Sequence, residues 1–202
     1  EENKIHGLIG RNGAGKTTLV SILSGVIEPT KGEIRVDGKT YGQLSRVKAK
    51  RLGVNIVPQE PTVVPKSTIA EMLISPDYIR NKNGLINWKA INQKAQEVLD
   101  KVGLKIDCSM LMEDIPISLQ QLLAIVKNFY IEESKVIVLD ESSASLSESD
   151  REILFNIIEK EKERCGILYI SHRTDEILRI CDVLTVLRDG KAVVTDHIDN
   201  MD

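Results

Sequence analysis

The most specific chemical motif in the sequence is a glycine-rich run of eight residues, Gly10-Arg11-Asn12-Gly13-Ala14-Gly15-Lys16-Thr17. It matches the pattern GxxxxGK[ST] without deviation, and Thr18 follows it directly. Such glycines let consecutive backbone N–H groups converge on phosphate oxygens at the start of a helix. Lys16 would supply positive charge to the β- and γ-phosphates, and the Thr17 hydroxyl could ligate Mg²⁺. The alternative is a glycine-rich turn beside a surface lysine, but the complete motif favours a nucleotide-phosphate site over residues 10–18.

A second chemical signal is an acidic pair that ends an apolar run, Val136-Ile137-Val138-Leu139-Asp140-Glu141. Ligands of open α/β sheets bind at the carboxyl ends of the strands, where this pair would lie. Asp140 could hold Mg²⁺ through water, and Glu141 could orient and deprotonate a water that attacks a γ-phosphate. Two ordinary surface acids are the alternative, and the phosphate motif upstream favours the catalytic interpretation.

The elements that must position these residues alternate between strand and helix at both ends of the chain. An apolar run over 5–9 precedes the glycine loop, and a helical pattern follows from Lys16 to about Ser24. Ser147 and Thr174 are predicted to cap helices. Further strands are predicted over 32–38, 52–57, 136–139, 166–170, 183–187 and 192–195, with Asp189-Gly190 as the turn of a final hairpin. This alternation predicts an α/β fold with a mostly parallel sheet and right-handed crossovers.

The middle of the chain, residues 61–131, has a mostly helical pattern and little strand signal. Asn87 is predicted to cap a helix that Gly103 ends, with apolar residues at three- and four-residue spacing between them, Trp88, Ile91, Ala95, Leu99 and Val102. Trp88 is expected in the core of this helix. We therefore predict a helical subdomain over 61–131, inserted into an α/β core formed by residues 1–60 and 132–202.

Composition excludes several other classes of protein. Hydrophobic residues make up 42% of the chain and charged residues 28%, which supplies a globular core. The net charge of −3 lacks the basic surplus typical of a nucleic-acid binder. Apolar runs are far shorter than the ~20 residues of a membrane span, and no signal-peptide pattern is visible. The odd number of cysteines at wide spacing, Cys108, Cys165 and Cys181, predicts free thiols in a reducing, cytosolic compartment.

Together these motifs resemble the nucleotide-binding domain of ABC transporters, and the resemblance covers nearly the whole chain. Gln59 falls at the position of the Q-loop glutamine, and His172 falls at that of the switch histidine. The segment Ala144-Ser145-Leu146-Ser147 resembles the D-loop. The other two histidines, His6 and His197, are interpreted as structural. The resemblance implies a P-loop NTPase fold, with a RecA-like, mostly parallel sheet, an inserted helical subdomain and a small antiparallel β portion.

The resemblance also implies a role for each matching residue. ATP is expected on residues 10–18, and Mg²⁺ on Thr17, Asp140 and Gln59. Glu141 is the expected general base and His172 stabilises charge on the γ-phosphate, with Gln59 as the third catalytic residue. In the family two ATPase domains sandwich two nucleotides head to tail, each phosphate loop facing the other domain's signature segment.

Within the family, the sequence looks most like those of the importers for ribose and related monosaccharides. The similar stretches are Pro58-Gln59-Glu60-Pro61, Thr68-Ile69-Ala70-Glu71, Gln120-Gln121, Ile170-Ser171-His172-Arg173 and Arg188-Asp189-Gly190. In that group two such domains are commonly fused, and this chain looks like the first half. We expect it to be truncated at its N-terminus, before which the family has an aromatic that stacks on adenine. The resemblance thus implies an ATP-hydrolysing subunit at the cytoplasmic face of the membrane, partnered by permease subunits and indirectly by a sugar-binding protein.

One segment departs from the family pattern, the LSGGQ signature. Counting back from Gln120 gives Ile115-Pro116-Ile117-Ser118-Leu119, with Pro116 at the serine position and Ser118 at the glycine position. Another register puts Ser118 at the signature serine, but only by deleting residues before Leu122. This degenerate signature leaves an alternative open: an ATP-binding regulatory module with weak hydrolysis. A non-transport ABC ATPase is a further alternative, for which a basic surface or long coiled coils would be expected.

Overall fold

The computed structural model describes residues 4–36, 38–132 and 134–201. The chain divides into two compact units. The first unit comprises Glu1–Gln59, Glu133–Ala144 and Ile158–Asp202, and the second comprises Glu60–Glu132 and Ser145–Ile157.

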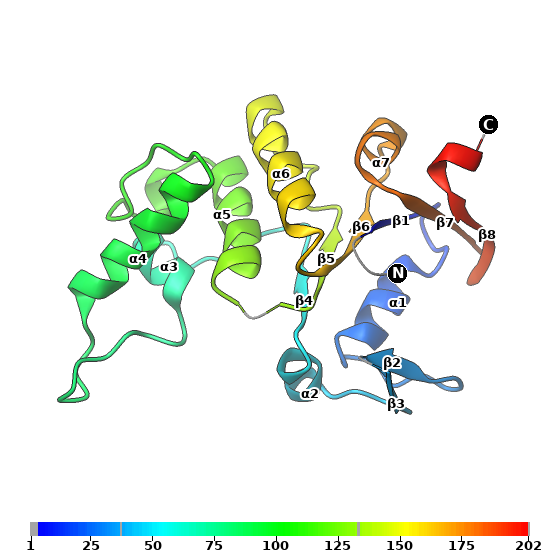
Figure 1. The fold of residues 1–202 in the computed structure, drawn as a ribbon, viewed down its shortest axis with the longest axis horizontal. Helices are drawn as coiled ribbons and strands as arrows, with labels where there is room; N and C mark the ends of the chain where they lie inside the picture. The colour runs from blue at the N-terminus through cyan, green and yellow to red at the C-terminus, as the bar shows by residue number, and fades with distance from the viewer. Residues whose placement is uncertain (1–3, 37, 133, 202) are drawn as a thin grey trace. The chain divides into compact units, whose positions relative to one another are not determined.

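A six-stranded sheet forms the centre of the first unit (Figure 1). Its strands, in spatial order, are β4 (Val54–Val57), β5 (Val136–Asp140), β6 (Gly166–Ile170), β1 (Ile5–Gly10), β7 (Val183–Arg188) and β8 (Lys191–His197). The first five run parallel, and β8 pairs antiparallel with β7 through the predicted hairpin. The predicted α/β fold with a mostly parallel sheet is therefore confirmed.

Helices cover both faces of the sheet, as the contacts of two successive residues of β1 show. Leu8 packs in a buried cluster with Val20 of α1 (Lys16–Leu23). A Cβ added to its neighbour Gly7 would instead meet Ile177 of α7 (Thr174–Ile180) at 3.2 Å. Successive side chains of a strand point to opposite faces, so α1 and α7 lie on opposite sides of β1, as Figure 1 shows. Because strands of this sheet are covered on both faces, their sequences are continuous apolar runs rather than alternating ones.

The remaining elements of this unit are short. They are β2 (Ile34–Val36) and β3 (Lys39–Tyr41), which pair antiparallel as a small separate sheet, and α2 (Arg46–Arg51). The predicted strands over 32–38 and 52–57 thus occupy fewer residues than expected. Ser45 caps α2 by accepting from the N–H of Lys48 at 3.3 Å.

The prediction that Thr174 caps α7 is wrong. Thr174 is the first helical residue, and Arg173 occupies the capping position with extended backbone angles. The hydroxyl of Ser171 accepts from the N–H of Arg173 at 3.1 Å, so the side-chain oxygen that orders this turn comes from three residues earlier. By contrast, Ser147 does cap α6 (Glu148–Glu161), accepting from the N–H of Asp150 at 3.2 Å.

The second unit is helical. Its helices are α3 (Ile69–Ile74), α4 (Trp88–Lys101), η1 (Met112–Asp114), α5 (Ile117–Tyr130) and the first part of α6. Thr68 and Glu71 form a capping box that begins α3, with bonds of 2.7 and 3.1 Å. The core of this unit is formed by fully buried side chains, among them Leu73, Ile91, Leu99, Met112 and Leu122.

Helix α4 begins and ends where its sequence predicts, but Trp88 lies elsewhere than expected. Asn87 caps the helix by accepting from the N–H of Ala90 at 3.1 Å, and Gly103 ends it with φ 78°. Trp88 is 47% exposed, so its expected place in the core is wrong. It is the first residue of α4, one turn before the buried Ile91, and its ring packs edge-on against Tyr78 with centroids 6.1 Å apart.

Two further sequence expectations concern cysteines and membrane spans. All three cysteines are buried and free. Burial raises the pKa of each thiol, that of Cys181 to about 12, so none is an activated thiolate. Among the described residues, no helix has both the length and the apolar character needed to cross a membrane.

Candidate nucleotide-binding site

Four adjacent strands bring the predicted site residues to one edge of the sheet. The order β4-β5-β6-β1 and the parallel pairing align the carboxyl ends, with Asp140 opposite Ile170, and Ile170 opposite Leu8. Past these ends lie the segments that carry Gln59, Glu141, His172 and the glycine loop. Residues up to 162 positions apart in sequence, Gly10 and His172, thereby reach one edge, where α/β sheets bind ligands.

The glycine loop curls around a cavity of about 320 Å³, lined by residues 12–18 and Glu141. Gly13 and Gly15 adopt φ values of 80° and 104°, which residues with a Cβ rarely adopt. Gly15 also occupies the capping position of α1, and among the described residues no side chain caps this helix. The first turn of α1 contains no acidic residue. The helix start therefore presents N–H groups and positive dipole to the cavity, which suits an anion.

Lys16 lies at the base of this loop. The side chain is only 7% exposed, and its ammonium donates to the Gly10 carbonyl at 2.7 Å and to the Arg11 carbonyl at 3.5 Å. These contacts hold the cation across the loop by way of backbone oxygens, and no carboxylate in the described part of the chain forms an ion pair with it. Its positive charge thus remains available to phosphate oxygens.

Glu141 and His172 meet at the same edge. His172 Nε2 lies 2.6 Å from Glu141 Oε1, and Glu141 also lines the loop cavity. The backbone of Glu141 has φ 50°, and its N–H donates to the Ile170 carbonyl at 2.9 Å. A positive φ at a residue with a long side chain costs on the order of 1–3 kcal/mol and is concentrated at functional sites. The fold thus holds this carboxylate in place against a local conformational preference.

Asp140 precedes Glu141 at the end of β5. Burial raises the pKa of Asp140, and the negative charge of Glu141 raises this pKa further, while Lys16 and His172 act in the opposite direction. Asp140 and Glu141 are adjacent in sequence, and the charge of Lys16 acts on Asp140. Their carboxylates offer hard oxygens, the donors that Mg²⁺ prefers. The residues present therefore fit a divalent cation beside a phosphate group.

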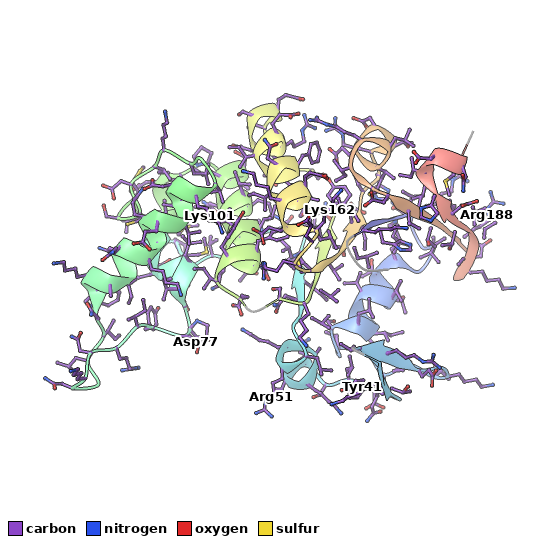
Figure 2. The ribbon with its side chains drawn as sticks, viewed as in Figure 1. Tyr41, Arg51, Asp77, Lys101, Lys162 and Arg188 are labelled. Carbon is purple, nitrogen blue, oxygen red and sulfur yellow. The ribbon has the colours of Figure 1, made fainter. Side chains whose placement is uncertain are left out.

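The β7–β8 hairpin contacts the glycine loop. The N–H of Gly190 in the hairpin turn donates to the Ala14 carbonyl at 3.0 Å. Gly10 pairs with Leu187 of β7, where a Cβ on Gly10 would lie 2.7 Å from the Leu187 carbonyl oxygen. A second cavity of about 460 Å³ lies beside this contact, and its lining includes Arg11, Asn12, His172 and Arg188, the last labelled in Figure 2. Sequence reasoning identified Asp189-Gly190 as a turn but missed this contact, for which the sequence carries no local signal.

Of the other residues predicted from the sequence, some line the loop cavity and others do not. Gln59 is exposed just after β4 and is not among the described residues that line either cavity. Thr17 and Thr18 are exposed on the wall of the loop cavity. Of the structural histidines, His6 is bonded to Thr185 at 2.8 Å and His197 to Lys4 at 3.4 Å.

The degenerate signature segment belongs to the helical unit. Pro116 occupies the capping position of α5, with φ −58° and no side-chain cap within the described part of the chain. The side-chain amide of Gln120 donates to the carbonyls of Met112 and Ile115, at 2.8 and 3.1 Å. These two bonds fix the turn in which a signature serine would stand.

A glycine-rich loop between a parallel strand and a helix, with an acidic pair ending another strand of the sheet, defines a P-loop nucleotide-binding fold. The chain belongs to the ABC transporter family, whose sequence profile matches residues 1–144.

Curated relatives from bacteria match nearly the whole chain. The ribose import ATP-binding protein RbsA 2 of Rhizobium etli is 41% identical over 199 residues, covering 98% of this chain and 39% of its own length. The D-allose import ATP-binding protein AlsA of Escherichia coli is 38% identical over 202 residues, covering 98% and 39%. The chain thus spans about two fifths of the length of these relatives.

Solved structures confirm the fold. A nucleotide-free ATP-binding cassette from an ABC transporter superposes with a TM-score of 0.82 at 21% identity, covering 98% of this chain and 81% of that one. The ATP-binding subunit of another ABC transporter gives 0.79 at 22% identity, covering 99% and 81%. At these identities the likeness concerns the fold.

Proposed function

We propose that this chain binds ATP with Mg²⁺ and hydrolyses it. The observation that carries the proposal is the pairing of Glu141 with His172, at 2.6 Å, on the wall of a phosphate-loop cavity. Residues 10–18 hold the phosphates, and Lys16 neutralises the β- and γ-phosphates. Glu141 accepts the proton of the attacking water, and His172 stabilises charge on the γ-phosphate.

Mg²⁺ would be held by Thr17, Asp140 and Gln59. When bound, it neutralises charge on the β- and γ-phosphate oxygens. Of the three ligands, Thr17 lines the cavity and Asp140 ends β5, whereas Gln59 is exposed after β4. We infer that Gln59 acts as both ligand and catalytic residue only when its loop is brought to the bound nucleotide.

The proposed role of this hydrolysis is to energise import of a ribose-type monosaccharide. The names of the relatives, which concern ribose, D-allose and arabinose import, support this substrate class. Because the chain spans about two fifths of these proteins, a second ATPase domain, fused or separate, would complete the sandwich. Permease subunits would hold the assembly at the cytoplasmic face of the membrane, and a sugar-binding protein would act indirectly. In this proposal the core is formed by residues 1–60 and 132–202, and the helical subdomain by 61–131.

The degenerate signature favours a second candidate, an ATP-binding module with weak hydrolysis that serves a regulatory or non-transport role. Pro116 offers neither hydroxyl nor N–H where a signature serine would stand, and Ser118 replaces a glycine. Glu141 and His172 are both present and paired, which is why hydrolysis is the first proposal.

The experiment compares ATP hydrolysis and MgATP affinity in the wild-type chain, Glu141→Gln and the control Glu163→Gln, an exposed acid in the same unit. We expect Glu141→Gln to keep its affinity and to lose about 10²–10⁴-fold in hydrolysis, because the general base is gone. The control should match the wild type. ATP binding with only weak hydrolysis, no lower in Glu141→Gln than in the wild type, would support the second candidate, and a wild type that does not bind ATP would overturn both.

A further inference from the structure

Glu176, the third residue of α7, is a buried carboxylate at the centre of a hydrogen-bond cluster. It is only 3% exposed. Its Oε2 accepts from three hydroxyls: Ser143 at 2.7 Å, Tyr169 at 2.7 Å and Ser171 at 3.1 Å. The guanidinium Nε of Arg173 lies 3.3 Å from Oε1. Burying a carboxylate is costly unless it is well hydrogen-bonded. Three hydroxyls, from the loop after β5, from β6 and from the loop after β6, offset this cost by donating to one oxygen.

Two of these donors belong to the loops that carry the proposed catalytic pair. Ser143 lies two residues after Glu141, in the turn closed by the Ala144 N–H donating to the Glu141 carbonyl at 3.1 Å. Ser171 directly precedes His172. One carboxylate oxygen therefore ties the loop after β5 to the loop after β6.

The two loops meet again at their functional ends, where Glu141 and His172 lie 2.6 Å apart. Glu141 also keeps its strained φ of 50° there. Strained backbone persists only where surrounding structure over-determines it. The hydrogen bonds of Ser143 and Ser171 to Glu176, which we call the anchor, hold the two loops on one side, and the Glu141–His172 contact holds them on the other. Together they provide such a constraint.

We propose that Glu176 is a positioning residue that fixes Glu141 and His172 relative to each other, through Ser143 and Ser171. It acts at a distance from the nucleotide, since the described residues lining the loop cavity do not include it. This inference rests on the proposed ATP hydrolysis for its kinetic consequence but not for its geometric one.

Tyr169 provides the matched control. Its hydroxyl donates to the same oxygen of Glu176, but it lies inside β6 rather than in either loop. Burial raises the pKa of Tyr169, so the hydroxyl stays protonated and donates. Tyr169→Phe therefore removes one buried hydrogen bond to Glu176 and keeps the donors Ser143 and Ser171, which bond to the same oxygen.

The first readout is the kinetics of ATP hydrolysis by Ser143→Ala, Ser171→Ala and Tyr169→Phe. We expect kcat to fall on the order of 10–100-fold in both serine variants, as for other residues that orient a reacting group, with KM for ATP nearly unchanged. Tyr169→Phe should keep kcat close to that of the wild type. An equal fall of kcat in Tyr169→Phe, or none in the serine variants, would overturn the proposal.

The second readout is the NMR spectrum of the imidazole of His172, one of only three histidines in the chain. It requires no hydrolysis, so it tests the anchor even if the wild type does not turn over ATP. Both serine variants should shift the ring signals of His172 more than Tyr169→Phe does. Signals unchanged in both serine variants would contradict the anchoring role, whereas a wild type without hydrolysis but with these shifts would contradict only the proposed function.

Discussion

Replacing Gly10 with alanine should disturb the phosphate loop by steric contact alone. A Cβ on Gly10 would lie 2.7 Å from the Leu187 carbonyl oxygen and 2.9 Å from the Ala14 Cβ. Both distances are shorter than the 3.5–4.0 Å at which non-bonded carbon atoms attract each other. One contact is backbone of the paired strand β7 and the other belongs to the loop itself, so neither can rotate away.

The cost follows from these contacts. Overpacking of a well-packed site costs about 1–3 kcal/mol, and for a chain of this size that corresponds to a fall in Tm of roughly 2–12 °C. If the loop shifts outward to relieve the clash, the N–H groups that face the cavity move with it. We therefore expect Gly10→Ala to lose stability, MgATP affinity, or both.

Thermal unfolding and calorimetry with MgATP measure the two quantities, with Gly42→Ala as the control. Gly42 is exposed, and an added Cβ would meet no described atom within 4 Å. That variant should be neutral or stabilising by up to about 1 kcal/mol through the unfolded state. Wild-type Tm and affinity in Gly10→Ala would refute the packing of the hairpin on the loop.

Three further outcomes are expected. Burial and the charge of Glu141 raise the pKa of Asp140 in the folded state, so the folded protein binds this proton more tightly and loses stability as pH rises from about 4 through that pKa. Without Mg²⁺, Asp140→Asn should therefore be more stable than the wild type in urea unfolding at pH 7, by a margin that shrinks as the pH is lowered. A margin that stays constant with pH would contradict this. Asn87→Ala removes the cap of α4 and should cost about 1 kcal/mol in urea unfolding, whereas an unchanged midpoint would show that the cap is dispensable. The chain itself should be largely monomeric and a weak ATPase, and Pro116→Ser with Ser118→Gly should raise hydrolysis in a way that depends on protein concentration; strong hydrolysis by a monomer would oppose this.

Local pattern predicts the fold where the determinants are contiguous. The glycine loop, the apolar strand that ends at Asp140 and the Asp189-Gly190 hairpin each carry their signal within a few residues, and the structure forms them there. Asn87 caps its helix for the same reason. Backbone conformation at such sites depends on neighbours in sequence, so single-sequence reasoning reaches it.

Tertiary contact decides the remainder. Trp88 has the helical spacing of a core residue, but it lies at the start of α4 beside Tyr78 and is half-exposed. Thr174 is a good capping residue, yet Ser171 orders that turn. Glu176 reads as an ordinary helix residue, because its partner Ser143 lies 33 positions away. The contact between the hairpin and the glycine loop, and the close pairing of Glu141 with His172, likewise depend on strand order.

The most direct test of the central claim, that this chain binds ATP on its glycine loop, is calorimetry of MgATP with the wild type, Lys16→Ala and Lys31→Ala. Lys16 is a buried cation in the loop, whereas Lys31 is an exposed one in the same unit. Losing a charged hydrogen bond of about 1.5–3 kcal/mol predicts affinity roughly 10- to 150-fold weaker for Lys16→Ala. Lys31→Ala should bind as the wild type does. Equal affinity of the wild type and Lys16→Ala would contradict the account.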